Sequence, residues 1–299
     1  MARFRTYSQT VEPAGAEVPE QVRAQGERLQ HRLAAIRHIV IVGSGKGGVG
    51  KSALSANLAA ALAAAGWRVG AVDADLNGPS LARMLGASTV PLVITPTGVT
   101  PALGVAGVRV VSMDLLLAAD DSPVRWRDPG GAGFIWQSTL ETGAVREFLA
   151  DVDWGSLDFL IVDAPPGTDK LQRLLTLVAR PSAVLLVTTP SETARHVVAR
   201  SVRLLREAGI PRLGLAANMA GYRCPACGHA EHLFGVDGAD RLAEAAGVPL
   251  WAEVPFDPAI AASTDVGRPF VLEPIASSAA DALRGLALRL LTELREEDP

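Results

Sequence analysis

A glycine-rich loop that contains two lysines is the strongest chemical signal in the chain. The octapeptide GKGGVGKS starts at Gly45 and includes both Lys46 and Lys51, although the chain has only three lysines among its 28 basic residues. The pattern Gly-x-x-x-x-Gly-Lys-Ser is typical of a phosphate-binding loop, whose backbone N–H groups surround phosphate oxygens at the start of a helix. In such a loop the lysine, here Lys51, reaches the β- and γ-phosphates, and the hydroxyl of the serine, here Ser52, binds Mg²⁺. The residues expected to contact the nucleotide in this loop are Gly45, Lys46, Gly47, Gly48, Val49, Gly50, Lys51, Ser52 and Ala53.

Three carboxylates follow apolar segments that we predict to be strands beside this loop. The segment FLIVDAPPG ends its apolar part at Asp163, and AVDADLNGPS contains Asp73 and Asp75. We expect Asp163, at the Walker B position, to hold Mg²⁺ through water. Asp73 is expected to support the same ion, also through water, and Asp75 to orient the attacking water. Gly167 is expected to offer its N–H to the γ-phosphate.

Short apolar segments alternate with helical patterns along most of the chain. Near-continuous apolar strands separated by helices are typical of a parallel sheet that is buried on both faces. We therefore predict an α/β fold with a doubly wound, mostly parallel sheet and helices on both faces, in one ATPase domain over 38–299 after a tail and short helix over 1–37. Strands are predicted at 38–43, 68–75, 108–113, 157–165, 182–190 and 212–219, and helices at 19–37, 51–65, 134–150, 169–180, 191–208, 238–246 and 279–297.

Composition excludes several classes of protein. A net charge of −4 gives no general attraction to nucleic acid or to an acidic membrane surface. No apolar segment reaches the roughly 20 residues that cross a bilayer, and the N-terminus lacks the apolar core of a secretory signal. The leucine-rich segment 279–297 leads into acidic residues, so we expect it to pack on the sheet and not on a membrane. These features predict a cytoplasmic protein with neither nucleic acid nor membrane as a partner.

The paired lysines carry a resemblance to known ATPases. GKGGVGKS resembles the deviant Walker A motif of the P-loop ATPases that include ParA, MinD, the nitrogenase iron protein and the Mrp/ApbC carriers. That resemblance implies that Lys46 reaches across a homodimer to phosphates bound by the partner subunit. There it would act as a cation delivered in trans to the charge that develops during phosphoryl transfer.

Further motifs narrow the resemblance to one branch. VDADLNGPS, DFLIVDAPPGT, NMAGYRCPACG and VPFDPAIAASTDVGRPFV together are similar to the Mrp/ApbC iron–sulfur cluster carriers, over about residues 38–295. The resemblance implies a homodimer that binds and hydrolyses ATP and passes a cluster from an assembly scaffold to apo-proteins. Asn218 matches the position that recognises adenine. The chain departs from the family at Asp169 and Lys170, where Gly-Asp usually follows PPGT, and at Ala53, where threonine is frequent.

The cysteine pair allows several kinds of site. Cys224 and Cys227 are the only cysteines of the chain and supply two thiolates, whereas a [4Fe–4S] cluster is held by four. A two-fold dimer that presents the pair at its axis supplies all four, and this shared cluster is the site that we favour. The main alternative is a zinc site from both cysteines with His229 and His232 in one chain. A thioredoxin-like redox pair and a purely structural turn are the others.

Two other functions fit part of the pattern. A MinD/ParA-like positioning ATPase would assemble reversibly on a membrane or on DNA, which requires a basic or lipid-binding surface. Neither the net charge nor the segment 279–297 predicts such a surface. A zinc-bound regulatory P-loop dimer is the second alternative, and it differs from the carrier in the metal that the cysteines hold.

Overall fold

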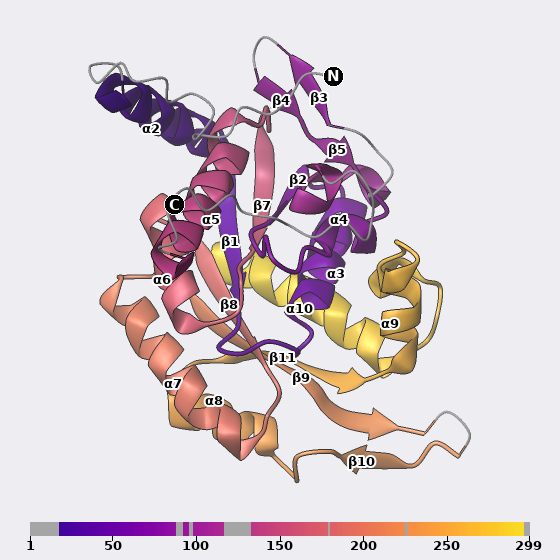
Figure 1. The fold of residues 1–299 in the computed structure, drawn as a ribbon. Helices are drawn as coiled ribbons and strands as arrows, with labels where there is room; N and C mark the ends of the chain where they lie inside the picture. The colour runs from indigo at the N-terminus through magenta and orange to yellow at the C-terminus, as the bar shows by residue number, and fades with distance from the viewer. Residues whose placement is uncertain are drawn as a thin grey trace.

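The computed structural model describes residues 18–87, 92–95, 98–116, 133–178, 180–224 and 227–295. These residues form a central sheet with helices on both of its faces (Figure 1). The strand order is β10-β9-β8-β1-β7-β2-β6-β5, and β11 lies along the other side of β9. All neighbours pair in parallel except β5 with β6 and β10 with β9. The predicted α/β fold with a mostly parallel sheet is therefore confirmed.

Six of the nine described strands of the sheet lie on the predicted apolar segments. Those in the centre are buried on both faces, as in β1, where Val40, Ile41 and Val42 are completely buried. The sheet strands are β1 (Ile36–Gly43), β2 (Val69–Asp73), β5 (Ala102–Leu103), β6 (Arg109–Val111), β7 (Leu157–Asp163), β8 (Ala183–Thr188), β9 (Leu213–Arg223), β10 (Ala230–His232) and β11 (Leu250–Phe256), while β3 (Val93–Thr95) and β4 (Gly98–Thr100) form a separate hairpin.

Two layers of helices cover the sheet. On one face α3, α4 and α10 contribute to one apolar cluster, and on the other face α2, α5, α6, α7 and α8 contribute to a second. The expected C-terminal helix is confirmed as a packing helix, because Leu283, Leu286 and Leu290 are buried against the sheet. The helices are α2 (Val18–Ala34), α3 (Lys51–Ala64), α4 (Leu81–Met84), α5 (Gly133–Asp151), α6 (Thr168–Leu177), α7 (Glu192–Glu207), α8 (Gly238–Ala246), α9 (Pro258–Asp265) and α10 (Ser278–Arg295). Within the described ranges, no helix has the length and apolar character needed to span a bilayer.

Four described strands of the sheet differ from the sequence-based prediction: β9 is longer than predicted, and β5, β10 and β11 were not predicted. Strand β9 does not end at residue 219 but continues to Arg223, and β11 was not predicted at all. Proline removes a ladder donor and is rare within strands, so Pro249 and Pro255 concealed β11 in the sequence. The structure tolerates Pro255 because, among the described strands, β11 pairs only with β9 and lies at an edge.

Candidate functional site

The phosphate-binding loop joins β1 to α3 at the carboxyl edge of the sheet. The strand register places Val42, Asp163 and Asp73 side by side at this edge. Gly50 precedes the first turn of α3 with φ of 81°, a left-handed conformation that glycine adopts without steric cost. A Cβ at Gly50 would also overlap the Asn218 amide, so both the conformation and the packing require glycine there.

The carboxylate of Asp163 contacts three polar side chains in the first turns of α3. The Nζ atom of Lys51 lies 2.7 Å from Oδ2 of Asp163, and both side chains are buried. The hydroxyl of Ser52 donates to Oδ2 of Asp163 over 2.6 Å, and the hydroxyl of Ser55 donates to Oδ1 over 2.6 Å. The predicted residues Lys51, Ser52 and Asp163 are thus brought together. Ser55 was not predicted, although its place one helical turn after Lys51 could have indicated it.

This donor set fits a magnesium ion. The hydroxyl of Ser52 and the carboxylate of Asp163 are hard oxygen ligands of the kind that Mg²⁺ prefers. Their oxygens are 2.6 Å apart and can face a common ion. The ammonium of Lys51 already lies against this carboxylate, so the pocket accommodates positive charge. When bound, the ion would neutralise the phosphate oxygens of a nucleotide.

Asp73 is held entirely by protein donors. Burial raises its pKa to about 7, and the neighbouring charge of Asp163 acts in the same direction. Its two oxygens accept hydrogen bonds from the N–H groups of Asp75 (3.1 Å), Ser80 (2.8 Å) and Leu81 (2.9 Å) and from the hydroxyl of Ser112 (3.1 Å). These bonds fix the segment between β2 and α4, and that segment carries Asp75.

Asp75 lies half-buried beside two lysines. Partial burial raises the pKa of its carboxyl, and the charges of Lys51 and Lys170 act in the opposite direction. Lys170, at the start of α6, is one of the three positions, with Ala53 and Asp169, at which the sequence departs from the ATPases that it resembles. The ammonium of Lys170, which replaces the usual residue of these ATPases, therefore lies where its charge lowers the pKa of Asp75.

Gly167 is bonded to the phosphate loop itself. Its N–H donates to the carbonyl of Ser44 over 2.9 Å, so contact with a γ-phosphate requires this bond to open. The hydroxyl of Ser44 is buried, and no hydrogen-bond partner for it is found among the described residues. Ser44 lies just before the recognised motif and was not predicted to belong to the site.

The other predicted residues of the loop, and Asn218 in β9, range from exposed to buried, with Gly45 and Ala53 partly buried. Lys46, Gly47 and Gly48 are exposed, and within the described part of the chain Lys46 forms no ion pair. Val49 and Asn218 are buried, and Nδ2 of Asn218 donates to the carbonyl of Val49 over 2.9 Å. The structure thus separates Lys46 from the cluster around Asp163.

Both cysteines lie at the tip of the hairpin formed by β9 and β10, which extends away from the helices at the lower right of Figure 1. Cys224 is partly buried and Cys227 is exposed. The N–H of Cys224 donates to the carbonyl of His229 over 2.8 Å, and its carbonyl accepts from Gly228 over 2.9 Å. Nowhere in the described residues do three His, Cys, Asp or Glu side chains gather as a zinc site within one chain would require. The zinc set with His229 and His232 is therefore not assembled in this structure.

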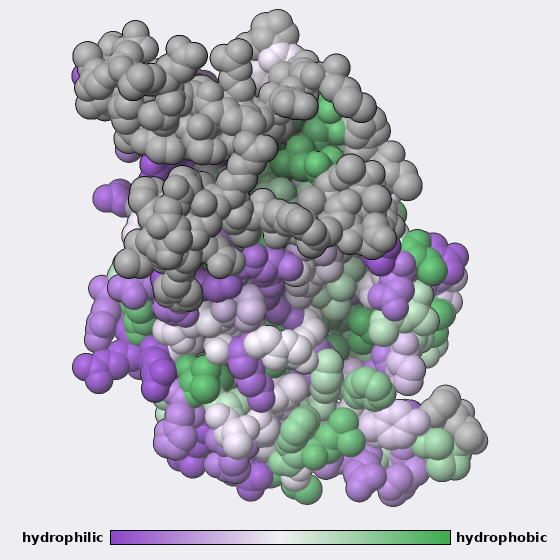
Figure 2. Space-filling view, in the orientation of Figure 1, coloured by the Kyte–Doolittle hydropathy of each residue, from purple (hydrophilic) through white to green (hydrophobic). Residues whose placement is uncertain are grey.

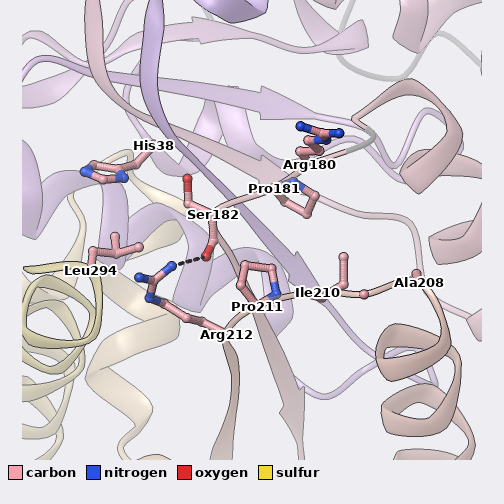
Figure 3. Close-up of a pocket in the computed structure, with 10 residues that line it drawn as sticks. His38, Arg180, Pro181, Ser182, Ala208, Ile210, Pro211, Arg212 and Leu294 are labelled. Carbon is pink, nitrogen blue, oxygen red and sulfur yellow. Dashed lines mark hydrogen bonds between the residues drawn. The ribbon is translucent and has the colours of Figure 1, made fainter. Parts of the chain in front are cut away.

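A cleft of about 550 Å³ lies at the opposite edge of the sheet (Figure 3). It is bordered by the segments that lead into β8 and β9 and by the start of β1, with His38 and Arg212 at one end and Arg180 at the other. The Arg212 guanidinium donates to the carbonyls of Glu293 (2.7 Å) and Ser182 (3.5 Å), which ties α10 to the sheet. Because the cleft is at the amino-terminal edge, it is separate from the phosphate loop.

Comparison with known proteins agrees with this geometry. The family described as ParA, NUBPL iron-transfer P-loop NTPase, matches residues 35–291. An iron-sulfur cluster carrier protein of Saccharolobus solfataricus is 40% identical over 258 residues, which are 86% of this chain and 84% of the relative. The human cytosolic Fe-S cluster assembly factor NUBP2 is 38% identical over 265 residues, which are 87% of this chain and 94% of that protein.

Solved structures show the same architecture. A nucleotide-binding protein from Archaeoglobus fulgidus, in complex with ADP, is 33% identical with a TM-score of 0.70, covering 83% of this chain and 94% of that one. The cell division ATPase MinD of Pyrococcus furiosus shares the fold with a TM-score of 0.58 at 24% identity, over 86% of this chain and 99% of that one. The family match spans the phosphate loop, the strand-end carboxylates and the cysteine hairpin. The chain therefore belongs to the NUBPL iron-transfer P-loop NTPases of the ParA group.

Proposed function

We propose that this protein is a homodimeric ATPase that carries an iron–sulfur cluster between its two subunits and delivers it to apo-proteins. The observation that supports this most directly is the cysteine hairpin. One copy offers two thiols, of which Cys227 is exposed and Cys224 is partly buried. Because a [4Fe–4S] cluster takes four thiolates, two hairpins related by a two-fold axis would complete the set. The names of the iron–sulfur carrier relatives agree with this cargo.

The described contacts support a distinct role for each residue at the nucleotide site. Lys51 would leave Asp163 to bind the β- and γ-phosphates, and Ser52 and Asp163 would hold Mg²⁺, with Asp163 acting through water. Asp73 would also support the ion through water and would not bind it directly, since its oxygens already accept hydrogen bonds from the segment between β2 and α4. The Asn218 oxygen, which is not the atom bonded to Val49, would accept from the adenine amine.

Lys46 would act on the partner subunit. Its exposed position at the outer side of the phosphate loop leaves it able to reach a second molecule. A compact ammonium on a flexible stem suits a loop crowded by backbone N–H groups. In the dimer this cation would stabilise charge that develops on the phosphates bound by the other subunit.

An apolar surface around the hairpin supports the dimer. Four large hydrophobic side chains are exposed close to β10 and to the end of β11: Leu233 (47%), Phe234 (36%), Val236 (62%) and Phe256 (42%). Figure 2 shows hydrophobic side chains gathered at the lower edge of this view, where Figure 1 draws β10 and the segment that leads to α8. Exposed apolar patches of this kind are typical of protein–protein contacts. A second copy seated here would bring the two hairpins together.

Delivery would proceed by exchange of ligands. Each thiolate of the client that bonds to an iron atom would replace one carrier thiolate, so the cluster moves without a change of oxidation state. The exposed position of Cys227 gives an incoming thiolate access to the site. Partners of the dimer would then be a scaffold that supplies the cluster and the apo-proteins that receive it.

Replacing Asp75 by asparagine is expected to slow ATP hydrolysis by about 100-fold and to change ATP affinity by much less. The carboxylate is half-buried near Lys51, and a neutral amide would orient the attacking water less well in the transition state. Steady-state phosphate release and equilibrium nucleotide titration measure the two effects. A variant that hydrolyses ATP at the wild-type rate would contradict this role, and Asp73 would become the next candidate.

Anaerobic reconstitution followed by iron, sulfide and zinc analysis tests the proposed function. A carrier should take up four irons and four sulfides per dimer, with a molar mass that corresponds to two chains. Stoichiometric zinc with no iron uptake would favour the zinc-bound regulatory dimer. A protein that binds neither metal and assembles on lipid vesicles or DNA with ATP would instead be a positioning ATPase.

A further inference from the structure

Strand β9 connects the nucleotide site to the cysteine hairpin. Its first part pairs with β8 inside the sheet, up to the pair Thr188 and Ala217. Its last part, from Gly221 to Arg223, pairs with β10 in the hairpin. Cys224 follows directly, so one strand runs from the carboxyl edge of the sheet to the cysteines (Figure 1).

The strand touches the phosphate loop where it leaves the sheet. Nδ2 of Asn218 donates to the carbonyl of Val49 over 2.9 Å, across 169 positions of sequence. A Cβ built on Gly50 would overlap this amide, and it would lie 3.7 Å from Cε of Met219. The backbone of the loop is therefore in close contact with the side chains of Asn218 and Met219, and a displacement of the loop would push on both side chains.

The residue after this contact has an unusual backbone. Met219 has φ of 58°, and the other non-glycine residues of the described chain with positive φ are Ala106 and Asp237. A long side chain is rare in this left-handed region, which is strained for any residue except glycine, so contacts around Met219 must hold it there. The ladder with β11 is also irregular here, since Val254 faces Asn218 and Phe256 faces Tyr222. Three residues of β9 thus oppose one residue of β11, which forms a bulge.

We propose that this bulge, residues 219–221, is a joint that transmits the nucleotide state of the phosphate loop to the cysteine hairpin. The Cβ of Met219 restricts the backbone at the joint to few conformations, so a shift of Asn218 would rotate the hairpin and would not be absorbed locally. Bulges reorient strands and side chains next to active sites. The inference rests on the proposed function, because it assigns to the ATPase site control over how accessible the cluster ligands are.

Alkylation of the two cysteines in the metal-free protein tests whether the joint transmits the nucleotide state, and it needs no bound cluster. Iodoacetamide is added to the full chain with no nucleotide, with ADP or with a non-hydrolysable ATP analogue, and labelling of Cys224 and Cys227 is followed by mass spectrometry. We expect the ATP analogue to change the labelling rate of at least one cysteine by about fivefold. A wild-type rate that is the same in all three states would overturn the joint. Cluster assembly, measured separately, would still decide the proposed function.

Three variants test whether the restricted backbone at Met219 causes the effect of nucleotide on cysteine labelling. Met219→Gly removes the Cβ restriction and should abolish the nucleotide effect on labelling, whereas Met219→Ala keeps the Cβ and should preserve it. Ala106→Gly is the matched control, because it frees another left-handed residue, in the turn Val105–Gly107 before β6. It should preserve the effect as well. Nucleotide affinity is measured for each variant. Loss of the effect in Met219→Ala, or its persistence in Met219→Gly, would contradict the proposal.

Discussion

Replacing Lys51 by alanine should weaken ATP binding by about 100-fold, since truncating a charged group that is buried and hydrogen-bonded costs about 2–5 kcal/mol. Lys51 lies 2.7 Å from Asp163 in the structure and is the buried lysine of the phosphate loop. Its removal takes away the positive charge that would hold the phosphates in the same subunit. Equilibrium titration with a fluorescent ATP analogue gives the affinity, and thermal unfolding without nucleotide shows whether the fold survives the loss of the ion pair.

Lys46→Ala is the matched comparison within the same loop. Because Lys46 is exposed and would act on the partner subunit, its removal should leave ATP affinity nearly unchanged and lower the hydrolysis rate by about 100-fold. Mixing Lys46→Ala with an Asp75→Asn subunit offers a further measurement. A mixed dimer keeps one site that has its own Asp75 and a partner lysine, so it should recover activity. Equal loss of ATP affinity in the two lysine variants would show that Lys46 acts within its own subunit.

Replacing either Cys224 or Cys227 by serine should abolish binding of the [4Fe–4S] cluster. A symmetric dimer loses two of its four thiolate ligands for each residue that is changed. Iron and sulfide analysis and the visible absorption of the reconstituted protein measure the loss. ATP binding and the fold should survive, because both cysteines lie at the hairpin tip, where Cys227 is exposed and Cys224 is partly buried.

A double variant, His229→Ala with His232→Ala, distinguishes the cluster from zinc. Both histidines are exposed, so their replacement should not disturb the core. A full cluster in this variant supports the bridging arrangement, which uses only cysteines. If the variant loses all metal and the wild type purifies with stoichiometric zinc, the carrier proposal fails.

The local part of the site was predictable from the sequence. A glycine-rich segment between an apolar strand and a helix has a limited choice of conformations, and the pattern GKGGVGKS specifies its backbone directly. Asp163 and Asp73 were also predictable as neighbours of this loop, because parallel strands in this topology bring their carboxyl ends to one edge. The confirmed prediction of the fold rests on the same alternation of buried strands and helices.

The contacts between distant segments were decided only by the tertiary structure. Ser55 reaches Asp163, Gly167 bonds to Ser44, and Asn218 bonds to Val49, each across more than 100 positions of sequence. No local pattern specifies such pairs, because they depend on the order and register of the strands. The left-handed conformation of Met219 is a further example, since a methionine by itself favours negative φ. On either side of this residue β9 contacts the phosphate loop and pairs with β11, and these contacts exist only once the whole sheet has formed.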